Sequence, residues 1–218
     1  MTLNQTLIRF PEIRLAVRDA HKLRGYFGNL FKEHSPLLHN HYEDGRLRYA
    51  YPLVQYKVID RIPMLTGIGE GAGLLMDLFL KIKEITIENR KYPVFSKNIE
   101  NRIVDLHETS ELISYSFVTL WMGLNEKNHN RYLKMSGEEK KKLLNRILTG
   151  NILSLYKGIG FHVQREILLT AELKEKKTKF KSIDMLAFSG SFICNAVLPE
   201  YVGLGKAVSR GFGTIIKT

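Results

Sequence analysis

"SGEEKKKLLNRILTGNILSLYKG", residues 136–158, carries the clearest structural signal in this sequence. Ser136 followed by Glu139 three residues later forms a capping box, an arrangement that opens many α-helices. Apolar side chains then recur at intervals of three and four until Gly158, at Leu143, Leu144, Ile147, Leu148, Ile152 and Leu155. This spacing predicts one long amphipathic helix that buries a single face in a core.

Strands are predicted on both sides of this helix. "ELISYSFVTLW", residues 111–121, precedes it, and "REILLTAEL", residues 165–173, and "IDMLAFSGSFICNAVL", residues 183–198, follow it. The first of them is rich in the β-branched and aromatic residues that strands favour. The lysine-rich residues 174–181 are expected to link the last two strands in a hairpin. A glycine-rich segment, residues 202–217, then ends in a last short strand.

The N-terminal half repeats this order, with a second helix added. Asp44-Gly45 is a strong signal for a hairpin turn. It joins the segment 39–42 to a run of aromatic and β-branched residues, 47–59. The expected order is strand, helix, strand, strand, helix, strand, over residues 6–10, 19–34, 39–42, 47–59, 65–82 and 84–95, where 65–82 begins as a glycine-rich turn and ends as a short helix.

Two halves of this kind predict an α+β protein with two tandem ferredoxin-like (βαββαβ) domains. The expected domains are residues 1–108, which carry a histidine pair, and residues 109–218, which carry the glycine-rich loop. The second domain is expected to be less complete, because its second helix has to fit in or near the glycine-rich segment.

Composition is that of an ordinary globular protein with an excess of basic residues. The 218 residues are 44% hydrophobic and 25% charged, so no disorder need be invoked. Lys and Arg outnumber Asp and Glu by 33 to 22, which gives a formal net charge of +11. Because such an excess attracts polyanions, nucleic acid is the first partner to consider.

The single cysteine, Cys194, excludes an intrachain disulfide and is expected to fill space in the core. No window approaches 18 uninterrupted apolar residues, and the N-terminal residues lack the apolar stretch of a signal peptide. These observations predict a soluble, cytoplasmic protein without a membrane anchor.

His39 and His41 lie just before the Asp44-Gly45 turn. Histidine exchanges protons near neutral pH and is also the commonest metal ligand. A histidine beside a turn often has only a surface or capping role. A metal site would need a third ligand such as His34 or His107, and no fixed spacing supports one. Acid–base chemistry, metal binding and a structural role are therefore all open from the residues alone.

The glycine-rich segment brackets several cations and a hydroxyl. Closely spaced glycines let backbone N–H groups approach a phosphate, and lysine and arginine add positive charge. The segment is not a Walker loop, because Glu200 and Ala207 occupy two of the positions that define that motif. A phosphate-contacting loop and a structural turn are both consistent with this composition. The residues concerned are Gly203, Gly205, Lys206, Ser209, Arg210, Gly211 and Gly213.

These features resemble a known family. A C-terminal loop "GLGKAVSRGFG", residues 203–213, on a basic chain of two ferredoxin-like halves resembles the repeat-associated RNA-binding (RAMP) superfamily of CRISPR systems. Leu38-His39 after the first helix, then Gly45 and the aromatic-rich "YAYPLVQYK", residues 49–57, are similar to the repeat-processing endoribonucleases of that superfamily. The resemblance covers nearly the whole chain, and the histidine region carries its enzymatic part.

The resemblance implies metal-independent cleavage of precursor CRISPR RNA within its repeats, with no cofactor. The 2′-hydroxyl of the RNA attacks the adjacent phosphate and leaves 2′,3′-cyclic phosphate and 5′-hydroxyl ends. His39 and His41 are the implied acid–base pair, and family members often add a tyrosine and a lysine, for which Tyr26 and Lys57 are the nearest candidates. The implied RNA-binding residues are Arg46, Arg48 and the loop residues Gly203, Gly205, Lys206, Ser209, Arg210, Gly211 and Gly213.

Two rival functions remain open at this stage. The first is a non-catalytic RNA-binding subunit of a CRISPR effector complex, and the second is a metal-dependent nuclease or hydrolase. The histidine pair favours the enzyme, because a pure binding protein has no need of titrating side chains. CRISPR repeat RNA is the expected partner, with the effector complex as a second one and no membrane. Either a monomer or a homodimer is consistent with the sequence.

Overall fold

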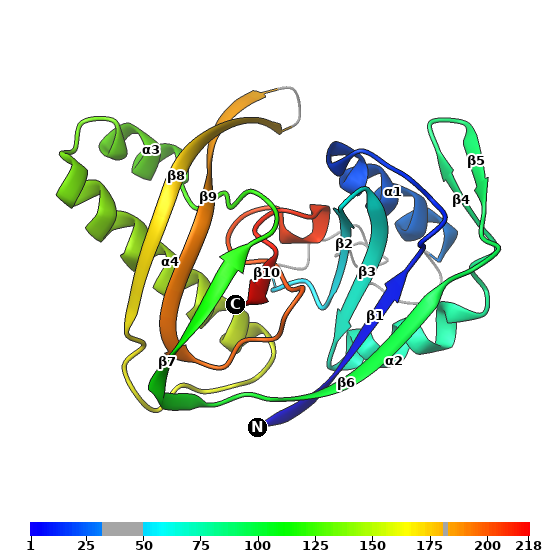
Figure 1. Ribbon diagram of the computed structural model, residues 1–218, viewed down its shortest axis with the longest axis horizontal. Helices are drawn as coiled ribbons and strands as arrows, with labels where there is room; N and C mark the ends of the chain where they lie inside the picture. Colours follow the sequence, from blue (N-terminus) through cyan, green and yellow to red (C-terminus); the bar gives the residue numbers. More distant parts are fainter. Residues whose placement is uncertain (32–49, 181–182) are drawn as a thin grey trace. The chain divides into compact units, whose positions relative to one another are not determined.

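The computed structural model describes residues 1–31, 50–180 and 183–218. The chain divides into two compact units. Unit 1 is Met1–Asp105 together with Ser209–Gly211, and unit 2 is Leu106–Val208 together with Phe212–Thr218. Figure 1 labels the helices and strands of both units.

Unit 1 is built on a four-stranded antiparallel sheet. Its strands are β1 (Thr2–Arg9), β2 (Val54–Ile59), β3 (Ile62–Ile68) and β6 (Asn98–Asp105). Their order is β2-β3-β1-β6, and every neighbouring pair is antiparallel. This is the strand order of a ferredoxin-like domain, so the fold predicted for the N-terminal half is confirmed.

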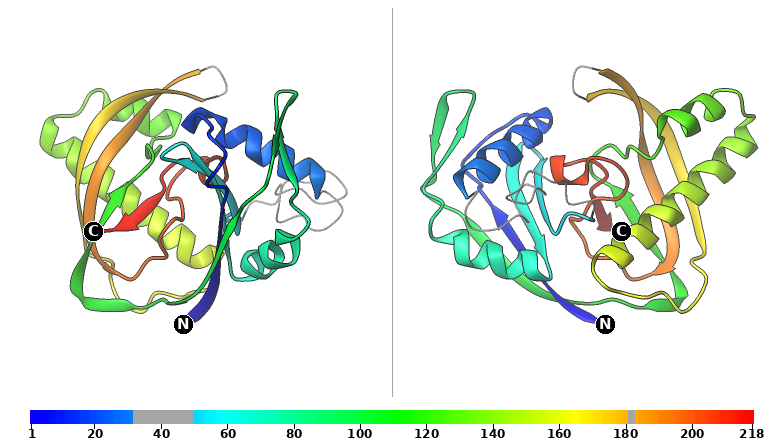
Figure 2. Two further views of the ribbon diagram at one scale, coloured as in Figure 1. Left: turned by 45° about the vertical axis from the view of Figure 1, so that its right-hand side comes forward. Right: turned by 180° about the vertical axis from the view of Figure 1, so that it is seen from behind.

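Two helices pack beside this sheet (Figure 2). The first, α1 (Ala20–Leu30), follows a 3₁₀ turn, η1 (Val17–Asp19), and the second is α2 (Glu70–Phe79). The ring of Phe27 on α1 stacks between Phe10 and Tyr56, with centroid distances of 6.2 and 5.9 Å. All three rings are fully buried, and they fix α1 against β2.

Three strand predictions in unit 1 need correction. The first concerns β3, which pairs with β2 although its residues from Leu65 onward were expected to begin a glycine-rich turn. Residues 84–95 form a separate hairpin, β4 (Glu84–Ile87) and β5 (Arg90–Pro93), and β6 takes the expected place in the main sheet. The reason is a two-residue turn, because Glu88 and Asn89 both adopt positive φ angles of 50° and 66°. Of the expected strand 47–59, only β2 is extended among the described residues. The predicted Asp44-Gly45 turn lies outside the described residues.

Unit 2 holds a second four-stranded antiparallel sheet. Its strands are β7 (Glu108–Phe117), β8 (Leu169–Phe180), β9 (Ile183–Ala196) and β10 (Ile215–Lys217), in the order β10-β7-β9-β8. The lysine-rich residues expected to link β8 and β9 are mostly strand, since β8 pairs with β9 as far as Phe180. An edge strand tolerates this run because its lysines can reach water on both faces.

The long helix of unit 2 is α4 (Gly137–Gly158), as predicted. The backbone N–H of Ser136 donates to Glu139 Oε2 at 2.9 Å, so the capping box is formed. A shorter helix, α3 (Glu126–Tyr132), precedes it. Between β9 and β10 the chain has only the 3₁₀ turn η3 (Val208–Arg210), which confirms that this domain is less complete.

The core of unit 2 is aromatic. The ring of Trp121, which is fully buried, lies 5.8 Å from Phe117 and 5.6 Å from Phe188, centroid to centroid. Cys194 is fully buried as well, which confirms its role as core filler. Among the residues with described positions, no helix combines the length and the apolar character needed to span a bilayer.

Candidate RNA-processing site

Four of the predicted site residues, His39, His41, Arg46 and Arg48, lie in the stretch 32–49, outside the described residues. His34, a candidate third metal ligand, lies there too. The structure describes the two flanks of this stretch, which are α1 on one side and β2 on the other. The catalytic assignment of the histidine pair therefore stays a prediction.

Lys57 lies on β2 and is completely buried. Its Nζ donates to Gln55 Oε1 at 2.9 Å, and Gln55 Nε2 donates to the hydroxyl of Tyr51 at 2.8 Å. Burial lowers the pKa of Lys57 from 10.5 to about 7, because the charged form is poorly solvated inside the protein. An amine with a pKa near neutrality can exist in both protonation states during a reaction.

Tyr26 occupies a different side of the sheet. Successive strand residues alternate between faces, so Lys57 points away from the face on which Tyr56 meets Phe27 of α1. Tyr26 lies on α1 with its ring edge-on to Phe27 at 5.1 Å, and its hydroxyl donates to the carbonyl oxygen of Glu84 at 2.9 Å. Burial raises the pKa of Tyr26. The structure thus gives Tyr26 a role in fastening α1 to β4, and its catalytic role stays a prediction.

The glycine-rich loop is closed by its own backbone. Gly203 pairs with Thr214, and the N–H of Leu204 donates to the carbonyl of Gly213 at 2.9 Å. A side chain on Gly213, whose φ is +66°, would collide with the carbonyl oxygen of Leu204. One on Gly205, at φ +89°, would lie 2.7 Å from the carbonyl oxygen of Met122. These glycines therefore have a structural explanation, and phosphate binding by the loop stays a prediction.

The tip of this loop, Ser209–Gly211, belongs to unit 1. A Cβ on Gly211 would lie 2.9 Å from the Cβ of Ala20 on α1 and 3.2 Å from the carbonyl oxygen of Tyr56 on β2. Only glycine permits so close an approach at a φ of +89°. The two elements that the tip touches are the flanks of the histidine stretch.

The positive charges of two arginines, Arg24 and Arg210, repel each other at this tip. Burial, and secondly the positive charge of Arg210, lower the pKa of Arg24, which lies on α1. A nearby anion such as a phosphate would relieve this repulsion between like charges. Sequence reasoning missed Arg24. The signal was its place beside the buried stripe of Ala20, Leu23 and Phe27, where a guanidinium interrupts an apolar helix face.

Lys206 and His107, two further candidates, belong to unit 2. Lys206 is exposed, and its backbone N–H donates to the carbonyl of Met122 at 2.9 Å. The carbonyl of His107, in unit 2, accepts a hydrogen bond from the N–H of Val197 at 3.0 Å. Within residues 1–31, 50–180 and 183–218, no three His, Cys, Asp or Glu side chains cluster closely enough to hold a metal ion.

The two sheets define an α+β protein with two ferredoxin-like domains. A solved structure described as a RAMP protein binding different RNA substrates shares this fold, with a TM-score of 0.57 at 12% identity. Family profiles then give a sharper result. The Cas6b N-terminal domain matches residues 1–105 and the Cas6b C-terminal domain matches residues 107–218. This chain belongs to the Cas6b family.

Solved structures agree with the family profiles. A crystal structure of Cas6b is 36% identical, with a TM-score of 0.95 and full coverage of both chains. A second, described as CRISPR RNA processing endoribonuclease Cas6b, is 34% identical with a TM-score of 0.81, again over the whole of both chains. An uncharacterized protein of Methanocaldococcus jannaschii is 32% identical over 142 residues, which cover 65% of this chain and 97% of that protein.

Proposed function

We propose that this protein is an endoribonuclease that cleaves precursor CRISPR RNA within its repeats. The observation that carries the proposal is similarity over the full chain to a solved structure described as a CRISPR RNA processing endoribonuclease, at 34% identity. The basic composition and the arginine pair at the loop tip support binding of a polyanion.

The proposed chemistry needs no metal. One histidine of the pair His39 and His41 takes the proton of a ribose 2′-hydroxyl, and the oxygen attacks the adjacent phosphorus. The bond from phosphorus to the 5′ oxygen breaks, and the other histidine gives that oxygen a proton. The products are a 2′,3′-cyclic phosphate and a 5′-hydroxyl. Proton transfer of this kind accelerates a reaction by roughly 10² to 10⁴-fold.

The described residues have supporting roles in this scheme. Arg24 and Arg210 are proposed to hold phosphate oxygens, since two repelling cations favour an anion near them. Lys57, with its pKa near 7, follows the histidine stretch on β2 and is proposed to stabilise the charged transition state in its protonated form. Burial in a site of low polarity strengthens such stabilisation.

Incubation of the protein with cognate repeat RNA in excess EDTA tests the proposal. The expected result is one cut per repeat, with a cyclic phosphate on the upstream product. A substrate with a single 2′-deoxy nucleotide before the scissile bond should bind normally and stay intact. Loss of cleavage on chelation would indicate a metal-dependent nuclease, and tight binding without any cleavage would indicate a non-catalytic subunit.

A further inference from the structure

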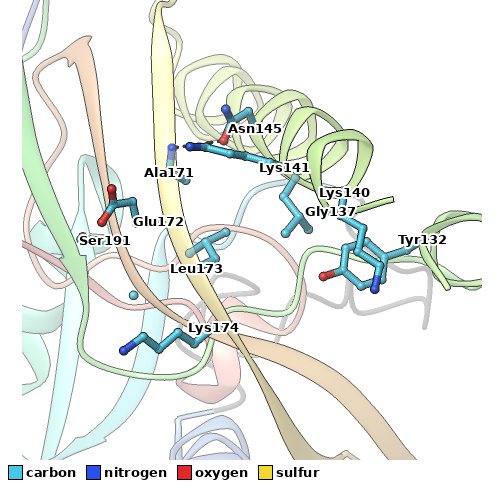
Figure 3. Close-up of a pocket in the computed structure, with 12 residues that line it drawn as sticks. Tyr132, Gly137, Lys140, Lys141, Asn145, Ala171, Glu172, Leu173, Lys174 and Ser191 are labelled. Atoms are coloured by element: carbon cyan, nitrogen blue, oxygen red, sulfur yellow. Dashed lines mark hydrogen bonds between the residues drawn. The ribbon is translucent and has the colours of Figure 1, made fainter. Parts of the chain in front are cut away.

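A groove of about 560 Å³ lies in unit 2 between α4 and β8, and its lining includes none of the candidate residues of the RNA-processing site (Figure 3). Helix and strand are joined at two points. The N–H of Ala171 donates to Asn145 Oδ1 at 3.1 Å, and Lys140 Nζ lies 3.5 Å from Glu175 Oε1. Lys141 is placed on the helix between these two points, and Leu173 on the strand between them.

One wall of the groove is polar backbone. β8 is an edge strand of the described sheet, and β9 is its neighbour. The N–H of Ala171 points away from β9, because it bonds to Asn145. Backbone groups on one side of an antiparallel strand recur at every second residue, so the N–H and C=O of Leu173 point the same way. They offer a donor and an acceptor to anything that enters.

The elements beside the groove carry a local excess of positive charge. The charged side chains that line the groove are Lys140, Lys141 and Lys174, against one carboxylate, Glu172. Lys140 is partly neutralised by Glu175 and covers the ring of Tyr132 at 4.6 Å. Lys141 and Lys174 are exposed, and neither forms an ion pair with any of the described residues. The charges that surround the groove therefore favour a polyanion.

We infer that the α4–β8 groove is a second RNA-binding site, which holds a short stretch of the substrate strand away from the reacting phosphate. Lys141 contacts the RNA phosphates, Lys174 adds positive charge from the other face of β8, and the backbone of Leu173 can bond to a base edge or a ribose hydroxyl. This inference rests on the proposed function, because that function supplies the RNA.

An extended peptide fits this groove less well than RNA does. A peptide that adds to a sheet edge needs several consecutive backbone hydrogen bonds with the edge strand. Here Asn145 occupies the N–H of Ala171, and the Lys140–Glu175 pair crosses from helix to strand four residues further along β8. The accessible edge between these points is too short for such a ladder, whereas one or two nucleotides fit a cavity of this size.

Lys141→Gln tests the site, and Lys157→Gln is its matched control. Both lysines are exposed on α4, and they lie 16 residues apart, or about 24 Å along the helix axis. Binding is measured with repeat RNA made uncleavable by one 2′-deoxy nucleotide. Lys141→Gln is expected to weaken binding and to lower the slope of log affinity against log salt by about 0.7, the value for one lost phosphate contact. Lys157→Gln should match the wild type.

A rate measurement separates this inference from the proposed function. With the all-ribose substrate and protein well below saturation, Lys141→Gln is expected to slow cleavage by the same factor by which it weakens binding, whereas Lys157→Gln should cleave at the wild-type rate. Equal affinity and equal salt slope for both variants would overturn the inference, even where the wild type cleaves. Failure of the wild type to cleave would instead overturn the proposed function. Equal displacement of RNA by an acidic peptide of the same charge would show that the groove is not an RNA site.

Discussion

Lys57→Met is expected to make the protein more stable near neutral pH. The buried amine has a pKa of about 7 in the folded protein, against 10.5 when it is solvated. Near pH 7 the amine is fully protonated in the unfolded chain but only partly protonated in the folded protein. This difference in proton binding costs about 4 kcal/mol of stability. Methionine has a similar shape and no charge. Loss of the hydrogen bond to Gln55 lowers the stability of the variant by about 1 kcal/mol, which leaves a net gain of about 3 kcal/mol.

The lowered pKa of Lys57 also predicts how wild-type stability changes with pH. A folded-state pKa below the unfolded value means that wild-type stability rises with pH between about 7 and 10.5. From about pH 7 to pH 9, the wild type should gain about 2 kcal/mol relative to Lys57→Met. Urea unfolding of both proteins at the two pH values measures this difference. Parallel pH profiles would refute the reasoning, because they would show that Lys57 titrates normally in the folded state.

The same variant connects stability with activity. If Lys57 stabilises the transition state, Lys57→Met should cleave repeat RNA more slowly while unfolding at a higher urea concentration. This combination is the expected signature of a destabilising group that is kept for function. Cleavage by Lys57→Met at the wild-type rate would show that Lys57 takes no part in the reaction. Its burial would then have no functional reason.

Three further outcomes are expected. His39→Ala and His41→Ala should each slow single-turnover cleavage strongly and leave RNA affinity nearly unchanged; rates within about threefold of wild type for both and for the double variant would exclude the pair from catalysis. Lys206→Ala should lower the salt slope of RNA binding by about 0.7, and an unchanged slope would place its side chain away from the RNA. Gly213→Ala should lower the free energy of unfolding by about 1–3 kcal/mol, whereas Gly150→Ala, at an open helix position, should not destabilise the protein.

Periodicity predicted the fold well where local signals were strong. The Ser136 capping box and the apolar stripe that follows it predicted α4, and the strands of the unit 2 sheet were expected around it. Residues 84–95 were misread because Glu88-Asn89 lacks the glycine that usually marks a two-residue turn. The lysine run of β8 was misread because charge on an edge strand resembles charge in a loop.

The site was less accessible to sequence reasoning than the fold. Charge and motif identified the loop cations, but Arg24 and Lys141 lie far from those motifs along the chain. The positive charge of Arg210 lowers the pKa of Arg24 in the folded protein, and the sequence alone does not show that the two residues interact. The groove beside Lys141 depends on how α4 lies against β8, and helical spacing alone does not specify that arrangement. Lys57 was a candidate through the family resemblance alone, because its burial cannot be read from a single charged residue.

The division of the glycine-rich loop has a consequence for how the chain is made. The loop tip, Ser209–Gly211, packs against α1 and β2, yet it follows the last strand of that sheet, β6, by about a hundred residues. During synthesis, β6 leaves the ribosome long before the tip does. Unit 1 can therefore form its sheet early but gains Arg210 only after nearly all of unit 2 has been made. The proposed anion site at the tip is thus assembled last, so a truncated chain would display the first sheet without it.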